Sequence, residues 1–343
     1  MAAACTFAAA ARAVRQRTAV VIPVYFPAGA APDLAGRLLR DNVGAFAAQV
    51  GTPAHICLSV DGLAHGRAAA AELGRELGVQ VVVAADNRGK LSALRAGAAH
   101  MLADPVFDFL AAVDMDGDHF APELHNLARA ALHARQSGSA GEVLVIGSRT
   151  SKHRPMGLWR GELEELADRV LLDALQYHAA CTGQPLCLEW ATAVEEYPDF
   201  HSGYKLFTRQ AAVAALLAEP QLLGVSDDAY YRHGVEAVMT VEALLAGARL
   251  VLVRRSTVNE QPVSAFGRLE RTRLVADKMV WPCRRLGVPA PFVDQWLRNH
   301  MPRLLLATLA PQGKEELLAI RRLVMADFGV AVDDQFAWGP LFV

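Results

Sequence analysis

The sequence predicts an α/β protein whose core is a doubly wound, mostly parallel β-sheet. Short apolar runs rich in β-branched residues alternate with longer segments whose apolar residues recur at helical spacing. Polar residues follow four of these runs, at Tyr25, Asp61, 87–90 and 114–118. The carboxyl ends of parallel strands meet at one edge of such a sheet, and ligands bind beyond that edge. We therefore expect the functional site there.

Composition and end signals define each element in turn. Residues 18–25 form a continuous apolar run typical of a buried parallel strand. Pro32 and Asp33 are start signals for a helix whose apolar residues continue to Phe46. The later expected strands are 55–60, 79–85, 107–113, 142–149, 201–208 and 249–254. The later expected helices of this region are 68–77, 91–102, 122–136, 157–181, 210–218 and 235–246.

We expect three regions along the chain. Residues 1–17 are rich in Ala and carry their Arg residues after the apolar part, the reverse of a signal peptide, so we expect a flexible leader. Residues 18–262 form the sheet domain. Residues 263–343 are expected to be helical, in segments of about 268–286, 291–306 and 314–328. We expect this last region to pack on the sheet domain.

The composition argues against several classes of protein. Of the 343 residues 53% are hydrophobic, which is enough for a substantial core. The net charge of −2 gives no electrostatic case for binding nucleic acid. No apolar run approaches the roughly 20 residues that a membrane-spanning helix needs. The five cysteines are odd in number and lack C-x-x-C spacing, which favours reduced thiols in the cytoplasm over a disulfide framework or a zinc site.

The most informative stretch is the apolar run 107–113 with the acids that follow it. Asp114, Asp116 and Asp118 come at alternate positions directly after this expected strand. Burying three carboxylates is costly unless a cation or hydrogen-bonding ligand compensates them, and their hard oxygens suit magnesium, manganese or calcium. An EF-hand loop is excluded because its glycine and glutamate positions hold His119 and His125. A solvated Asp/Gly turn is the simpler alternative.

The order of these pieces resembles the GT-A fold glycosyltransferases, particularly family 2 and its relatives. The resemblance covers about residues 18–260. It is carried by the motifs VVIPVY at 20–25, SVDG at 59–62, NRGK at 87–90, AVDMDGDH at 112–119, GSR at 147–149 and DFHSGYKLF at 199–207. The resemblance implies a GT-A (Rossmann-like) domain that binds a nucleotide-sugar, with the helical C-terminal region appended to it.

Several residues acquire expected roles from the resemblance. Pro23 and Tyr25 are expected at the lip of the nucleotide pocket. Asp61 is expected to hydrogen-bond the base. The remaining nucleotide-sugar contacts are assigned to Arg88, Lys90, Asp114, Met115 and Asp116. The divalent metal (magnesium or manganese) is assigned to Asp116, Asp118 and Asn259. A sugar diphosphate leaves with developing negative charge, which a metal and basic groups stabilise.

The second half of the chain admits two matches. In the first, Asp228 is the general base of an inverting family 2 enzyme and deprotonates the acceptor hydroxyl. In the second, 233–236 resembles the Gly-Val-Glu helix start of glucosyl-3-phosphoglycerate and mannosylglycerate synthases, and Glu236 lines the sugar pocket of a retaining enzyme. We favour the second match, because the helix and strand that follow also fit. A carboxylate stabilised by the helix dipole is the structural alternative for Glu236.

The donor sugar or the acceptor is expected at His201, Ser202 and Gly203, and an anionic acceptor at His153 and Arg154. The expected function is therefore metal-dependent hexosyl transfer from a UDP- or GDP-sugar to a small soluble acceptor, with a homodimer as a compatible assembly. A nucleotidyltransferase would need a Gly-rich basic loop after the first strand, which is missing. A nucleotide-sugar-binding protein without catalysis is the remaining alternative.

Overall fold

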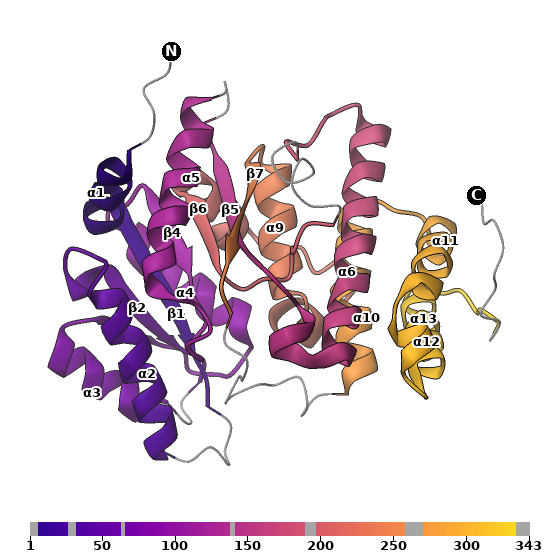
Figure 1. Cartoon of the computed structure of the whole chain (residues 1–343), viewed down its shortest axis with the longest axis horizontal. Coiled ribbons are helices and arrows are strands. Elements are labelled where there is room, and N and C mark those ends of the chain that lie inside the picture. Colours follow the sequence, from indigo (N-terminus) through magenta and orange to yellow (C-terminus); the bar gives the residue numbers. More distant parts are fainter. Residues whose placement is uncertain are drawn as a thin grey trace.

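The computed structural model describes residues 6–26, 32–62, 66–137, 141–188, 197–257 and 270–333 (Figure 1). Asn259, one of the expected metal ligands, lies outside these ranges. So does the side chain of Arg154, one of the expected acceptor contacts.

A seven-stranded sheet forms the centre of the molecule, in the order β3-β2-β1-β4-β6-β5-β7. The strands are β1 (Thr18–Val24), β2 (Ile56–Val60), β3 (Gln80–Val83), β4 (Phe109–Ala112), β5 (Val143–Arg149), β6 (Lys205–Thr208) and β7 (Arg249–Arg255). All neighbouring pairs are parallel except those of β6, which runs antiparallel to both β4 and β5. The predicted mostly parallel sheet flanked by helices is confirmed, with one reversed strand.

Alternate strand residues point to opposite faces of the sheet, and both sets are apolar. Helices therefore cover both faces. One core contains Val20 and Ile22 of β1 and is closed by α1 (Phe7–Arg17), α2 (Pro32–Ala47), α3 (Arg67–Leu77) and α5 (Leu124–Gln136). The other contains Val21 and is closed by α4 (Lys90–Leu102), α6 (His153–Thr182), α9 (Val235–Leu245) and α10 (Arg271–Arg285). Both faces are thus buried, as a parallel sheet requires.

The amino-terminal segment differs from the flexible leader expected from its composition. The Thr6 hydroxyl accepts a hydrogen bond from the Ala9 amide (3.2 Å) and caps α1. Ala10 and Val14 are buried in one core, and α1 packs on α5. The expectation of a leader is therefore wrong for residues 7–17. Ala10, Ala13 and Val14 recur at helical spacing and form the buried face of this helix.

The carboxyl-terminal helices lie at the opposite end of the molecule from α2 and α3 (Figure 1). They comprise α10, α11 (Ala290–His300), α12 (Leu306–Leu309) and α13 (Gly313–Asp327). Helix α10 contacts α6, α9 and α13, so it joins this region to the sheet domain. The short α8 (Arg209–Ala212) follows β6 and continues into a π-helical turn, Val213–Leu217. Among the described helices, none has both the length and the apolar character needed to cross a membrane.

Candidate functional site

Four strand ends deliver polar groups to one edge of the sheet, as the sequence predicts. The Asp61 amide donates to the Val24 carbonyl (3.0 Å), which joins the ends of β2 and β1. The Tyr25 amide contacts the Met115 sulfur (3.3 Å), which joins the ends of β1 and β4. Lys90, which opens α4 after β3, pairs with Asp114 (2.6 Å). The contacts show that all four segments meet.

Asp61 organises the loop that follows β3. Its carboxylate is buried and accepts hydrogen bonds from the backbone amides of Arg88 (3.0 Å) and Gly89 (2.9 Å). Gly89 has a φ of 120°, and a Cβ there would lie 2.5 Å from the Tyr231 carbonyl oxygen. Only glycine fits this position without strain. Asp61 is thus placed at the predicted edge, with its oxygens engaged by the chain's own amides.

Lys90 lies between two carboxylates that are far apart in the sequence. Its Nζ is 2.6 Å from Asp114 Oδ1 and 2.7 Å from Glu236 Oε1. Burial opposes the charge of each group, but their mutual attraction outweighs it. The pKa of Lys90 is therefore raised, and the pKa values of Asp114 and Glu236 are lowered. All three groups are charged at neutral pH, and the cluster carries a net charge of −1.

Asp116 stands beside this cluster in a different electrostatic environment. Burial, followed by the neighbouring charge of Asp114, raises the pKa of Asp116 to about 6. One of its oxygens accepts a hydrogen bond from the Asp118 amide (3.1 Å). A cation placed beside Asp114 and Asp116 would relieve the repulsion between their carboxylates. The two side chains therefore fit a divalent metal through hard oxygen ligands.

Three residues that sequence reasoning did not assign to this role hold Asp114 in place. Asn42 Nδ2 donates to the Asp114 carbonyl (2.8 Å), and the Asp114 amide donates to His119 Nδ1 (3.0 Å). The His119 ring stacks on Tyr204, with centroids 4.7 Å apart. Gly203 leaves room for the carboxylate, because a Cβ there would lie 2.4 Å from Asp114 Oδ2. The donor sugar or the acceptor was expected at Gly203, and the space beside its backbone is occupied by the Asp114 carboxylate.

Asp118 is placed differently from the metal ligand expected at that position. Its carboxylate is buried and pairs with Arg255 (3.0 Å), which also donates to the carbonyl of Asp118 (3.0 Å). A guanidinium already neutralises this carboxylate. Within the described ranges, the only three-residue set of His, Cys, Asp or Glu whose potential ligand atoms all lie within 4.8 Å of one another is His153, Glu162 and Glu165. The three aspartates do not form such a set, and the metal ligands expected at Asp116, Asp118 and Asn259 stay a prediction.

His201 and Ser202 lie in the interior, where the sequence led us to expect contacts with the sugar or the acceptor. His201 Nδ1 is 2.7 Å from Asp168, and its side chain is fully buried. The Ser202 hydroxyl donates to the Gly147 carbonyl (2.6 Å). Lys205 fastens the same turn by donating to the carbonyls of Phe200 (2.8 Å) and Ser202 (2.5 Å). Both predicted side chains thus bond to the protein itself.

The two candidate catalytic acids in the second half of the chain differ in burial and in their ionic partners. Asp228 is 66% exposed and pairs with Arg232 one helical turn away (2.6 Å). Glu236 is only 13% exposed and contacts Lys90. It lies in the first turn of α9, where the helix dipole also favours a carboxylate. The structure brings Glu236 to Asp114 through Lys90 and leaves Asp228 on the surface.

The remaining predicted residues are distributed as follows. Arg88 lies over the Tyr231 ring (4.5 Å to the centroid) and pairs with Asp227 (2.9 Å). Pro23 is buried within β1, whereas Tyr25 is 43% exposed at the edge of the sheet. His153 opens α6 and contacts Glu162 (2.6 Å).

Comparison with known proteins finds only distant similarity. No family model and no curated protein sequence matches the chain. Among solved structures, a mycobacterial protein is similar with a TM-score of 0.49 and 20% identity, over 83% of this chain and 80% of that one. A mannosyltransferase from Pyrobaculum calidifontis, in complex with GDP-Man and Mn²⁺, has a TM-score of 0.40 and 17% identity, over 91% and 71%. S. aureus TarS 1–349, in complex with UDP, has a TM-score of 0.41 and 14% identity, over 91% and 89%. Similarity at this level assigns neither activity nor site residues.

Proposed function

We propose that the chain is a glycosyltransferase that uses a nucleotide-sugar donor, a UDP- or GDP-hexose, and a divalent metal, magnesium or manganese. The observation that carries this proposal is the cluster of Lys90, Asp114 and Glu236 beside Asp116, at the carboxyl edge of the sheet. Doubly wound sheets bind ligands beyond this edge. The sequence motifs that resemble GT-A enzymes supply the substrate class, and this part of the argument is by analogy.

Each group has a role in this proposal. Asp61 shapes the loop 87–89 and, on binding, offers an oxygen to the donor base. Asp114 and Asp116 hold the metal, and Asp118 is left out of the ligand set because Arg255 neutralises it. When bound, the metal neutralises charge that develops on the departing diphosphate. Lys90 adds a positive charge beside the same carboxylates and orients Asp114.

Glu236 is proposed to line the sugar pocket, and the transfer to retain anomeric configuration. Lys90 contacts the carboxylates of both Glu236 and Asp114, and so keeps Glu236 close to the proposed metal ligands. The acceptor is a small soluble molecule with a hydroxyl group. The inverting alternative requires Asp228 to reach the acceptor as general base, but its exposure and its pairing with Arg232 favour a surface role.

A panel of nucleoside diphosphates and nucleotide-sugars, with and without Mn²⁺, tests the proposal by thermal shift. A ligand that binds only the folded protein adds about 2.7 kcal/mol at 100 times its dissociation constant. We expect a shift with UDP or GDP that needs the metal and disappears in Asp116→Asn. Arg75→Gln, an exposed change in α3, is the control. No shift with any nucleotide would contradict the proposal. Metal-dependent release of nucleoside diphosphate then distinguishes a transferase from a protein that only binds the donor.

A further inference from the structure

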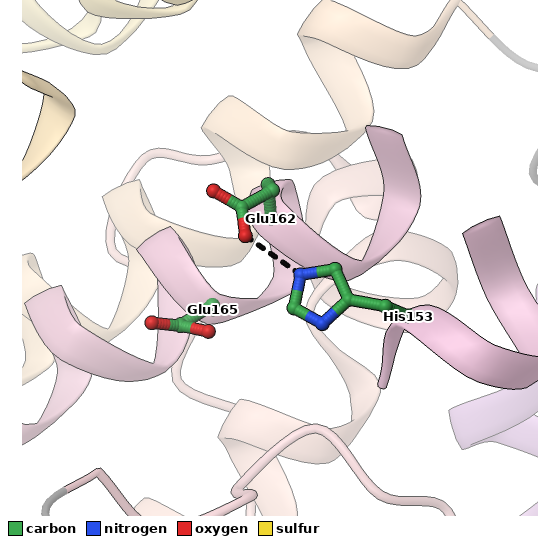
Figure 2. Close-up of side chains that lie close together, drawn as sticks. All are labelled: His153, Glu162 and Glu165. Atoms are coloured by element: carbon green, nitrogen blue, oxygen red, sulfur yellow. Dashed lines mark hydrogen bonds and ion pairs between the residues drawn. The ribbon is translucent and has the colours of Figure 1, made fainter. Parts of the chain in front are cut away.

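A second group of metal-ligating side chains lies at the start of α6. His153, Glu162 and Glu165 each offer a ligand atom, and these atoms all lie within 4.8 Å of one another. Figure 2 shows the imidazole directed at Glu162, with Glu165 one turn further along the same helix. Glu162 and Glu165 are three residues apart and therefore share a helix face.

The backbone of α6 creates this arrangement. Gly157 has φ 75° and ψ 169°, so the first turn of α6 is kinked away from the rest of the helix. The kink folds His153 back onto Gly161, where a Cβ would lie only 2.8 Å from the imidazole Cδ2. Two glycines thus let an imidazole from one segment face two carboxylates on the next.

The charges of the group are incompletely compensated by other protein side chains. Glu162 is 4% exposed, and its contacts are His153 Nε2 (2.6 Å) and the Leu306 amide (3.3 Å). In the part of the chain that the structure describes, neither Lys nor Arg reaches it. Burying a carboxylate is costly unless a cation compensates it. Both hydrogen bonds from Arg169 are accepted by Glu165 Oε1. Among the described residues none donates to Glu165 Oε2, so this oxygen is available to a ligand.

We propose that His153, Glu162 and Glu165 form a binding site for a divalent transition-metal ion of the Zn²⁺ class. One imidazole nitrogen and two carboxylates are ligands that Zn²⁺ accepts, and three protein ligands leave a position for water. The imidazole distinguishes this site from the all-oxygen site proposed at Asp114 and Asp116. The ion takes the place of the proton between His153 Nε2 and Glu162 Oε1. That proton moves to Nδ1 or to solvent.

The site would fasten three segments together. His153 belongs to the first turn of α6, the two glutamates to its long second part, and Glu162 also holds the backbone at the start of α12. A bound ion would therefore hold the kink closed against the carboxyl-terminal helices. This inference does not rest on the proposed glycosyl transfer, because none of the three residues contacts Lys90, Asp114 or Glu236.

The test uses full-length protein without a histidine tag, stripped with a chelator and carrying Asp116→Asn to weaken the other proposed metal site. Zn²⁺ binding is measured by calorimetry, and Co²⁺ is used as a spectroscopic probe of nitrogen coordination. We expect one equivalent of Zn²⁺ to bind and to raise the melting temperature. Loss of a residue that only supports a metal ligand lowers affinity about 10- to 100-fold. His153→Ala and Glu165→Gln should each lower Zn²⁺ affinity at least that much.

His133→Ala, on the exposed face of α5, is the matched control and should leave Zn²⁺ affinity unchanged. Circular dichroism of the stripped variants checks their folding, and Glu165→Gln is conservative enough to keep the helix intact. Absence of saturable Zn²⁺ binding in the Asp116→Asn protein would overturn the proposal. So would equal Zn²⁺ affinity in His153→Ala, Glu165→Gln and their parent. The group would then be a hydrogen bond that closes the kink.

Discussion

Gly203 packs directly against the carboxylate of Asp114, at a distance that leaves no room for a side chain. A Cβ on Gly203 would lie 2.4 Å from Asp114 Oδ2 and 3.0 Å from its Cγ. The turn before β6 therefore sets the position of the first acid of the Asp-x-Asp pair. The reversed strand β6 pairs with β4, the central strand of the sheet, and therefore lies next to the proposed site.

Gly203→Ala is expected to lower nucleotide-dependent stabilisation and activity, because the added methyl group must displace the Asp114 carboxylate, which pairs with Lys90. Overpacking of this kind costs roughly 1–3 kcal/mol of stability. Gly36→Ala is the control, because nothing lies within 4 Å of a Cβ in that helix. It should stabilise the protein by up to about 1 kcal/mol. Unchanged metal-dependent binding in Gly203→Ala would show that Asp114 is not positioned by this contact.

Lys90→Met should remove the cation that links Asp114 to Glu236. The two carboxylates would then repel each other in a partly buried site, which we expect to cost roughly 1–3 kcal/mol. Thermal unfolding in low salt measures this change. Lys314→Met, an exposed substitution, should have little effect. A Lys90→Met protein as stable as its parent would mean that the two acids do not depend on Lys90.

The variants Asp228→Asn and Glu236→Gln distinguish the proposed retaining mechanism from the inverting alternative. Asp228 is exposed and pairs with Arg232 one helical turn away. Its substitution should therefore change stability by less than about 0.5 kcal/mol and leave turnover intact. Glu236→Gln should abolish transfer and leave donor binding measurable. Initial rates with the donor found by thermal shift provide the readout. The opposite pattern would favour the inverting mechanism with Asp228 as base.

The buried pair of Arg149 and Asp199 should make the protein sensitive to acid. Arg149 Nη2 is 2.5 Å from Asp199 Oδ1, and Nε is 2.9 Å from Oδ2. Burial opposes the charge of Asp199, but Arg149 outweighs it and holds the pKa of Asp199 below its usual value of 3.8. The stabilisation that the pair contributes is complete above pH 3.8 and is lost as the pH falls through the pKa of Asp199 in the folded protein.

Asp199→Asn tests the direction of this pH dependence of stability. It should destabilise the protein by about 3–5 kcal/mol at pH 7, because Arg149 loses a buried counter-ion. The difference between the parent and the variant should narrow below pH 3.8. Denaturant unfolding across this range gives the two curves. If they stay parallel down to the lowest pH at which both fold, the pair does not contribute in this way.

Helix α1 should contribute to stability although it precedes the first strand. Val14→Ala removes a fully buried side chain and should cost about 1–3 kcal/mol. Arg12→Ala, an exposed change in the same helix, is the control and should have little effect. Equal melting temperatures for both variants and the parent would show that the packing of α1 does not contribute to stability.

The sequence predicted the parts of this protein that depend on local pattern. Apolar runs and helical spacing identified the strands and helices, and polar residues after the runs identified the sheet edge where Tyr25, Asp61 and Asp114 meet. These predictions succeeded because strand alternation and helical periodicity are properties of neighbouring residues. The reversed direction of β6 was not predictable in this way, since direction depends on pairing with distant strands.

The choice of partner for each charged side chain was decided only by the tertiary structure. Asp114, Asp116 and Asp118 look equivalent in the sequence, yet their surroundings differ. Asp114 pairs with Lys90, and Asp118 pairs with Arg255. Burial and the charge of Asp114 raise the pKa of Asp116. Likewise, Asp228 and Glu236 are both plausible acids in the sequence, and folding brings only Glu236 to Lys90. The physical reason is that the charge state and chemistry of an acid depend on burial and on cations within a few ångströms, which come from segments remote in the chain.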